Sequence, residues 1–419
     1  MTPPRAGHAT GHASGPGTVE FVVMMAMMFA TIAFSIDAML PALHTIGSEL
    51  APQYRNEAQL IVTAFVFGMG LGTFVTGPLS DTFGRKPVVV AGAGLYIAAA
   101  ALAWASPSLE LIPVARLLQG IGAAGPRIVT LAIIRDLYSG REMARLMSFV
   151  MIVFTLVPAI APLMGAAIMA VGGWRSIFVS FVIFSALSTL WVMVRLPEPL
   201  PRAARRPFRP AALRSAVVEV LSHASVRISI LVQALCYGML FSMLSSVQQV
   251  YDVSFGRGDS FPLWFGACAI IAGTSSFLNA ALVMRLGMRF LVTTMLATQI
   301  VLSGGMIAIL LSGLRGDALF YVFFLWQVGI FYQAGLTIGN LNAIAMEPLG
   351  HVAGMAASVI GAVSTVLSVL LAVPVGLAFD GTPLPLAIGI LAMAVIAFAL
   401  MLALRRMEHP APRSTAGRG

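Results

Sequence analysis

The segment Gly77-Pro-Leu-Ser-Asp-Thr-Phe-Gly-Arg-Lys-Pro87 places one acid and two bases between two apolar stretches. These stretches cover residues 58–77 and 88–106. Each has roughly the 20 residues that an α-helix needs to cross a bilayer. The glycines and prolines predict a tight turn directly after a helix end. We interpret the segment as a short charged loop that joins two membrane-spanning helices.

The same alternation continues along all 419 residues of the chain. Apolar residues make up 59% and charged residues 10% of the sequence, and the mean hydropathy is +0.93. A soluble domain holds about 25% charged residues, so the composition excludes a cytosolic enzyme, a secreted disulfide scaffold and a disordered chain. We predict an all-α polytopic membrane protein with twelve transmembrane helices near 20–43, 58–77, 88–106, 111–134, 146–170, 174–194, 226–250, 261–283, 290–312, 317–341, 352–377 and 383–404.

A hydrophilic stretch divides these helices into two groups of six. Aligning Gly84 with Gly287 also aligns Lys86 with Arg289. This similarity is weak, but together with the helix count it supports two duplicated halves around a central cavity. We expect a disordered tail at 1–18, a six-helix half at 19–194, a basic linker at 195–225, a second six-helix half at 226–404 and a tail at 405–419.

The basic residues predict the orientation in the membrane. The chain has 25 of them against 16 acids, for a net charge of +9. With both termini in the cytoplasm, 19 of the 25 fall in cytoplasmic segments and four in outside loops. Because positive residues gather on the cytoplasmic side, we expect a multi-pass protein of the bacterial inner membrane with cytoplasmic N- and C-termini. The same rule explains the positive charge without a nucleic-acid partner.

Three charged residues, Asp37, Arg116 and Arg127, lie well inside the predicted helices rather than at their ends. A charge at the centre of such a helix costs roughly 2.5–3.5 kcal/mol on insertion scales. Asp37 lies roughly 9 Å and Arg116 roughly 8 Å from the same membrane surface, at 1.5 Å per residue. A facing ion pair is expected if the first and fourth helices are neighbours. The alternative is that this ion pair has a purely structural role.

The fourth predicted helix carries a polar stripe. Arg116, Gln119, Ala123 and Arg127 recur at steps of three and four residues and share one helix face. Such a face must meet protein or a water-filled cavity, because lipid would make it very costly. Alternatively, an Arg near a helix end can extend its side chain to the interface. We assign Gln119, Ala123 and Arg127 to the substrate cavity.

The second half supplies uncharged polar groups within its predicted helices. We place four of them at the cavity, although hydrogen bonds between helices would explain them equally well. These four are Gln233, Tyr237, Gln327 and Gln333.

The charged loop itself predicts a conformational latch. Asp81 could accept hydrogen bonds from a neighbouring helix N-terminus. Arg85 and Lys86 could pair with acids at adjacent helix ends, such as Asp136 or Glu142. Such contacts would hold one conformation and break in another.

These motifs resemble those of a known family. The loop is similar to the signature loop of the major facilitator superfamily at Gly77, Leu79, Asp81, Gly84, Arg85 and Lys86, with Thr82 where a base is common. Residues 116–124 resemble a motif of its drug:proton antiporters. Residues 37–43 resemble the first helix of the bicyclomycin/chloramphenicol-type multidrug exporters. Residues 172–178 fit that branch, and their antiporter motif is matched by Pro158, Pro162 and Gly165.

The resemblance implies the major facilitator fold and a secondary active transporter. Asp37 matches the carboxylate that takes up a proton in exchange for drug, and Arg116 matches the Arg that tunes it. The physics agrees, since burial raises the pKa of an acid and a nearby Arg lowers it. We therefore expect proton-coupled efflux of small amphipathic drugs or toxic compounds across the inner membrane. Glycines and prolines in the fifth helix would suit two rocking halves.

Two alternatives remain beside drug efflux. A proton-coupled transporter of a specific metabolite or siderophore stays in the transport class, and two cavity arginines would favour an anion. A membrane-embedded transferase is disfavoured, because it would need clustered acids or an intramembrane His. We expect no enzyme activity, no cofactor beyond the proton gradient and no metal site, with Cys236 and Cys268 as packing residues. The expected partners are protons, a small-molecule substrate and the lipid bilayer, and we expect a monomer.

Overall fold

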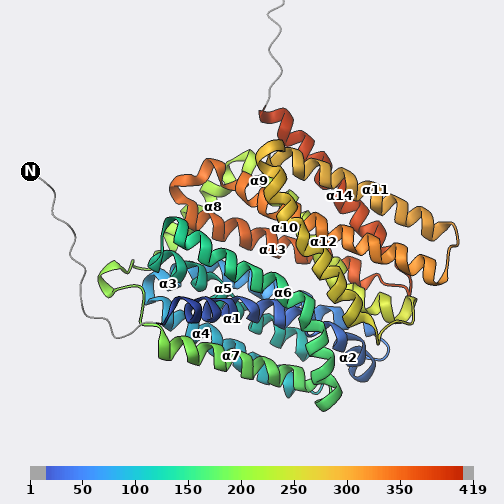
Figure 1. The fold of residues 1–419 in the computed structure, drawn as a ribbon, viewed down its shortest axis with the longest axis horizontal. Coiled ribbons are helices and arrows are strands. Elements are labelled where there is room, and N and C mark those ends of the chain that lie inside the picture. The colour runs from blue at the N-terminus through green and yellow to red at the C-terminus, as the bar shows by residue number, and fades with distance from the viewer. Residues whose placement is uncertain (1–15, 409–419) are drawn as a thin grey trace, which may run out of the picture.

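The computed structural model describes residues 16–408, and within that range the chain forms helices and no strands. Long helices run roughly parallel, with the first half (blue to green) below the second half (yellow to red) in Figure 1. The helices of the first half are α1 (Thr18–Asp37), α2 (Leu43–Leu50), α3 (Leu60–Phe83), α4 (Arg85–Trp104), α5 (Leu111–Leu137), α6 (Gly140–Gly172) and α7 (Arg175–Arg195).

The second half repeats the pattern of long apolar helices. One apolar segment, Gly316–Leu377, holds two passes joined by the short helix η5 (Glu347–Val352), so the eleven membrane-length segments correspond to twelve passes. This confirms the predicted all-α polytopic fold. Its helices are α9 (Ala224–Gln249), α10 (Phe261–Leu286), α11 (Met288–Leu311), α12 (Gly316–Met346), α13 (Ala353–Leu377) and α14 (Leu384–Glu408).

The first pass is broken, whereas the sequence analysis expected one helix over 20–43. Helix α1 ends at Asp37, the short helix η1 covers Leu40–Ala42, and α2 then continues to Leu50. Pro41 is the physical cause, because it has no N–H to donate to the carbonyl of Asp37 four residues earlier. The break therefore begins at the acid that the sequence singled out.

The turn between α3 and α4 supports the duplication. Gly84 there has φ +103° and ψ 164°, and Gly287 between α10 and α11 has φ +81° and ψ 153°. Left-handed φ values of this kind favour glycine. The two turns, which are similar in sequence, thus also have a similar backbone conformation.

Two helix pairs join the halves: α3 packs against α13, and α6 packs against α10. Within the first half, α3 and α5 approach so closely that a Cβ at Gly120 would collide with the carbonyl oxygen of Phe65. Small residues allow this close packing, which is how helices associate inside a bilayer. The close α3–α5 contact fixes the position of the polar face of α5.

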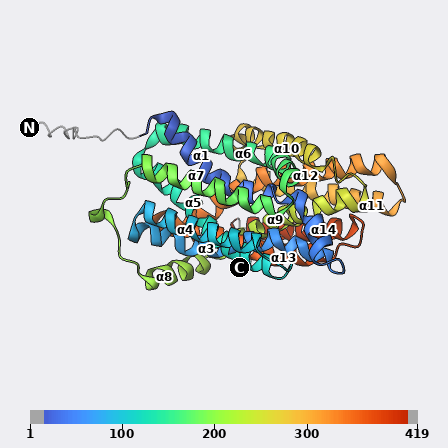
Figure 2. The same ribbon diagram turned by 90° about the horizontal axis from the view of Figure 1, so that it is seen from below.

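The connection between the halves is partly helical. Within the predicted linker 195–225, η3 (Arg202–Ala204) and α8 (Pro210–Ser222) form, and α8 packs against α9 and α13. The rest of the linker projects at one end of the bundle (Figure 2). That end also carries Gly84, and we name it the basic end; the end with α2 is the far end. The predicted tails lie outside the described residues at 1–15 and 409–419, and α14 continues past 404 to Glu408.

Candidate functional site: a cavity and a buried acid

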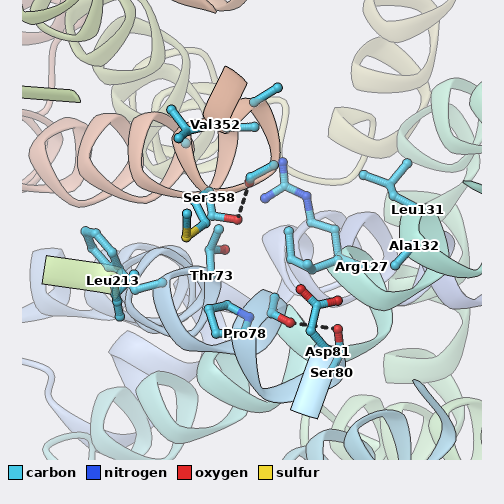
Figure 3. A pocket seen from close by; sticks show the side chains of 18 of the residues that line it. Thr73, Pro78, Ser80, Asp81, Arg127, Leu131, Ala132, Leu213, Val352 and Ser358 are labelled. Carbon is cyan, nitrogen blue, oxygen red and sulfur yellow. Dashed lines mark hydrogen bonds between the residues drawn. The ribbon is translucent and has the colours of Figure 1, made fainter. Parts of the chain in front are cut away.

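A cavity of about 980 Å³ lies between the halves and reaches the basic end. Helices α3 and α5 form one wall, and α9, α12 and α13 form the other, with α8 at the mouth. Figure 3 shows Thr73, Arg127 and Ser358 around this common space, on α3, α5 and α13. A space of this size can hold a drug-sized molecule.

Three of the seven predicted cavity residues line this space. Arg127 comes from α5, and Gln233 and Tyr237 come from α9 on the opposite wall. The amide of Gln233 is engaged, since Ser364 Oγ donates to its Oε1 at 3.0 Å. The Arg127 guanidinium donates from Nη1 to Met69 Sδ at 4.0 Å. The first half therefore contributes a cation to the cavity wall, and the second half contributes neutral polar groups.

The other four predicted cavity residues lie within helix packing in this conformation. Gln327 accepts a hydrogen bond from the Tyr251 hydroxyl at 2.8 Å, and Gln333 donates to Thr337 Oγ1 at 2.9 Å. Interhelical and intrahelical hydrogen bonding thus explains these amides. These four residues are fully buried and do not line the cavity: Gln119, Ala123, Gln327 and Gln333.

Asp37 is buried where α1 breaks, with 5% of its surface exposed. Helix α1 packs against α5, α6 and α7, so this acid faces protein rather than acyl chains. Among the described residues, its carboxyl group has no hydrogen-bond or ion-pair partner. A charged carboxylate in such a place is costly unless a cation or water reaches it.

Arg116 is fully buried on α5, and its donors are occupied by neutral acceptors. Nη2 donates to the carbonyl oxygen of Ser35 at 2.8 Å, Nε to the carbonyl oxygen of Ile61 at 3.1 Å, and Nη1 to Gln119 Oε1 at 2.7 Å. The guanidinium also lies 4.3 Å from the centre of the Phe65 ring, within cation–π range.

The predicted ion pair between Asp37 and Arg116 is not formed in this structure. The guanidinium instead binds the backbone of α1 two residues before the acid. The expectation rested on the depth of the two residues in the membrane, and depth does not fix which face of α1 meets α5. Arg116 fixes the end of α1, and Asp37 is left without a counter-charge.

Helix α6 touches the same break. A Cβ at Gly165 would collide with the carbonyl oxygen of Ala38, the residue after Asp37. Pro158 and Pro162 lie on the same helix, and α6 also packs against α10 of the second half. The residues of the predicted antiporter motif therefore connect the buried acid to the interface between the halves.

The predicted latch residues meet at the basic end. Arg85 is buried, and its Nη1 donates to Asp81 Oδ1 at 2.6 Å and its Nε to Asp136 Oδ2 at 2.7 Å. The pairing of Arg85 with Asp136 matches the expectation. Gly77, on α3, faces α13 near Ser358. The ion pairs join α3, α4 and α5 within the first half, so they leave the halves free to separate at this end.

Lys86 and Asp81 differ from the expectation. Lys86 Nζ donates to the carbonyl oxygens of Met193 and Leu196 at the end of α7, because those helix carbonyls lack partners of their own. The N-terminus of α4 is capped by Glu198, whose carboxylate accepts from the backbone N–H groups of Arg85 and Lys86 at 2.8 and 3.0 Å. The sequence analysis missed Glu198, although an acid just after a basic helix end was the available signal.

The far end is closed by hydrogen bonds between the halves, which we name the far-end network. Gln59 Nε2 donates to Gln249 Oε1 at 2.7 Å, and Gln249 Nε2 donates to Asn56 Oδ1 at 2.6 Å. His44 Nδ1 lies 2.8 Å from Asp252 Oδ2. The structure is thus open at the basic end and sealed at the far end.

Metal-binding residues do not gather within residues 16–408, where no group of three His, Cys, Asp or Glu side chains is placed to hold an ion. Cys236 and Cys268 are free and buried.

Comparisons with known proteins agree with this geometry. The chain is 27% identical to a bicyclomycin resistance protein homolog of Haemophilus influenzae, over 83% of this chain and 86% of the relative. It is 27% identical to the multidrug resistance protein MdtL of Vibrio parahaemolyticus, over 78% of this chain and 81% of the relative. A crystal structure of a D-xylose–proton symporter superposes with a TM-score of 0.72 at 15% identity, covering 91% of this chain and 97% of that one. The model of the Major Facilitator Superfamily matches residues 19–373, and the chain belongs to that family of membrane transporters.

Proposed function

We propose that the protein exports small amphipathic drugs or toxic compounds from a bacterial cell in exchange for protons. The names of two relatives, a bicyclomycin resistance protein homolog and a multidrug resistance protein, support drug efflux. A single observation carries the proton coupling: Asp37 is a buried carboxyl without a counter-charge at the break of the first pass. We assign it as the group that carries the proton.

The orientation follows from charge. Arg85, Lys86 and the arginines of the linker gather at the basic end, and positive residues favour the cytoplasm. The cavity then opens to the cytoplasm and the far-end network faces outside. We propose that this chain works as a monomer in the inner membrane.

The state described here fits a protonated transporter that awaits its substrate. A neutral carboxyl needs no counter-charge, so we infer that Asp37 holds a proton in this conformation. Substrate enters the cavity from the basic end and contacts α5. Helix α5 reaches Asp37 through the bond from Arg116 to the Ser35 carbonyl. Movement of α5 would therefore open a path for water to Asp37, and the proton would leave toward the cytoplasm.

Export to the other side requires the far end to open. The far-end network must then break. At the basic end, the two halves must come together so that the cavity closes there, beside α3 and α13. With the cavity open to the outside, substrate leaves, and a new proton reaches Asp37. Each cycle exchanges a proton for one substrate molecule at a site that faces one side at a time.

A drug-susceptibility panel in a pump-deficient bacterium tests the proposal. Cells that produce the protein should tolerate a set of amphipathic compounds better than cells with the empty vector. An uncoupler or the Asp37→Asn variant should remove that advantage while the protein remains in the membrane. Equal tolerance in cells with and without the protein, across the panel, would contradict export.

A further inference from the structure

The cavity carries an excess of positive charge. Its charged lining residues comprise five arginines, His351 and a single carboxylate, Asp81. That carboxylate is already bonded to Arg85, and His351 is paired with Glu219. Within the described cavity wall, four guanidinium groups are left without a carboxylate within ion-pair distance: Arg127, Arg135, Arg206 and Arg209.

Arg127 is the deepest of the four. It lies ten residues before the end of α5, which places it about 15 Å inside the bundle from the basic end, near the middle of the membrane. Arg135, Arg206 and Arg209 lie at the mouth, where water and lipid headgroups neutralise charge. A cation at the depth of Arg127 is costly without an anion or water beside it.

The two buried arginines of α5 differ in what they can still bind. The donors of Arg116 are taken by two backbone carbonyls and Gln119, and its side chain is fully buried. Arg127 is half-buried, and its contact with the thioether of Met69 is long, at 4.0 Å. Its planar guanidinium therefore retains donors that match the geometry of a carboxylate.

Neutral groups complete the wall opposite Arg127. Tyr237, which carries a hydroxyl, lies on α9 in this wall. That hydroxyl and the Asn342 amide have no hydrogen-bond partner among the described residues, so both remain available to a ligand. Apolar side chains line the rest of this space: Phe74, Ile128, Leu131 and Ile338.

From this arrangement we infer that the cavity selects amphipathic anions, with the carboxylate or other acidic group of the substrate bound to Arg127 and its apolar body against α3, α5 and α12. Arg127 is then the residue that determines specificity for charge. This inference rests on the proposed export function and names its substrate class.

The test measures binding to the purified full-length protein in a neutral detergent. The probes are a series of aromatic carboxylates from 1-naphthaleneacetate to 1-pyrenebutyrate, each beside its neutral primary amide. Each pair keeps its shape and changes only the charge, and calorimetry gives both affinities at pH 7. We expect carboxylates to bind about tenfold or more tightly than their amides, because hydrogen bonds to charged groups are the strong ones.

Variants test whether Arg127 causes the preference for carboxylates over amides. Arg127→Gln should bring carboxylate affinity close to that of the amide, and Arg127→Lys should keep most of the preference because it keeps the charge. Arg141→Gln removes an exposed arginine outside the cavity and should change neither affinity. Thermal unfolding of each variant checks that it is folded, and Arg127→Met, which also removes the charge, replaces Arg127→Gln if that variant does not fold.

Two results would overturn the inference. One is that no carboxylate of the series binds more tightly than its amide. The other is that the preference survives in Arg127→Gln. Failure of the proposed function is recognised separately, because proton release by Asp37 is measured in another assay and charge preference in binding does not depend on it.

Discussion

Asp37 is the residue on which the proposed exchange of proton for substrate depends. Pro41 ends α1 at this acid, so the carboxyl group lies beside a carbonyl that has lost its helical donor. Its side chain is 5% exposed, and in the described part of the chain it has no cation partner. A group in this position can take up and release a proton with small movements of the helix break.

Arg116 acts on this acid through the backbone. Its guanidinium holds the carbonyl oxygens of Ser35 and Ile61 and thereby ties α1 and α3 to α5. Removing it would leave two buried acceptors without a donor, and each such group costs about 1–3 kcal/mol. Arg116 is therefore a structural anchor as well as a neighbour of the proton site.

We predict that Arg116→Ala lowers the stability of the purified protein by at least about 2 kcal/mol. Arg141→Ala is the matched control, because Arg141 is exposed, and it should change stability by less than about 0.5 kcal/mol. Unfolding of detergent-solubilised protein with heat measures both variants. Equal stability of the two variants would show that the buried guanidinium is not an anchor.

The prediction from the sequence differs most from the structure in the contacts of single side chains. The sequence identified Asp37 and Arg116 as the buried charges, because a charge inside an apolar run is conspicuous. It could not show their partners, because these depend on which face of α1 packs against α5. The buried amides Gln327 and Gln333 were placed at the cavity for the same reason: composition does not distinguish a cavity wall from a helix interface.

At the scale of elements, α6 connects the proton site to the moving halves. Gly165 allows α6 to touch the carbonyl of Ala38, and the same helix packs on α10. A side chain at this position would push α6 away from the break, because a backbone carbonyl has little room to yield.

We predict that Gly165→Ala destabilises the protein by about 1–3 kcal/mol, as overpacking does, and reduces drug resistance. Gly94→Ala makes the same chemical change on α4 at a site with open space around it. That variant should keep both resistance and stability. Susceptibility assays and thermal unfolding compare the two, and identical behaviour would remove Gly165 from the coupling.

The far-end network is the second element-scale feature. Gln249 bonds both Gln59 and Asn56, so it holds α9 of the second half against the short helix η2 (Arg55–Gln59) of the first half. In the state described here these bonds hold the far end shut.

Gln249→Leu should shift the population toward conformations that are open at the far end. Spin labels at Tyr54→Cys and Val253→Cys report on it, since both positions are exposed at the far end and the native Cys236 and Cys268 are buried. Double electron–electron resonance should show longer distances in this variant. Gln299→Leu removes a buried amide bonded within the second half, to Ser303, and should leave the distances unchanged. A distance distribution that Gln249→Leu does not alter would contradict a gating role.

The elements themselves were largely predictable. Apolar length fixes a membrane helix, so all twelve passes of the described chain were expected. Their ends differ from the prediction by at most six residues, apart from the first pass, which continues through α2 to Leu50. The helix α8 was not expected, because arginines and prolines dominate the sequence around it. The cap by Glu198 was also missed, since such a cap depends on where the linker returns to α4.

At the scale of the whole molecule, the structure combines an open basic end with a closed far end. The ion pairs of Arg85 at the basic end stay within the first half, whereas the far-end hydrogen bonds cross between the halves. This asymmetry is what a carrier with alternating access needs, because the bonds of one end can break without disturbing those of the other. The energy for the change of state would come from the proton on Asp37.

The measurement that tests this account most directly is proton release by the purified protein in a weakly buffered detergent solution. The added substrate is a compound to which the protein confers resistance. The wild-type protein and the control Asp259→Asn, which changes an exposed acid, should both release a proton on addition of substrate. Asp37→Asn should bind the same compound and release none. Release by Asp37→Asn equal to that of the wild type would contradict the assignment of Asp37 as the proton carrier.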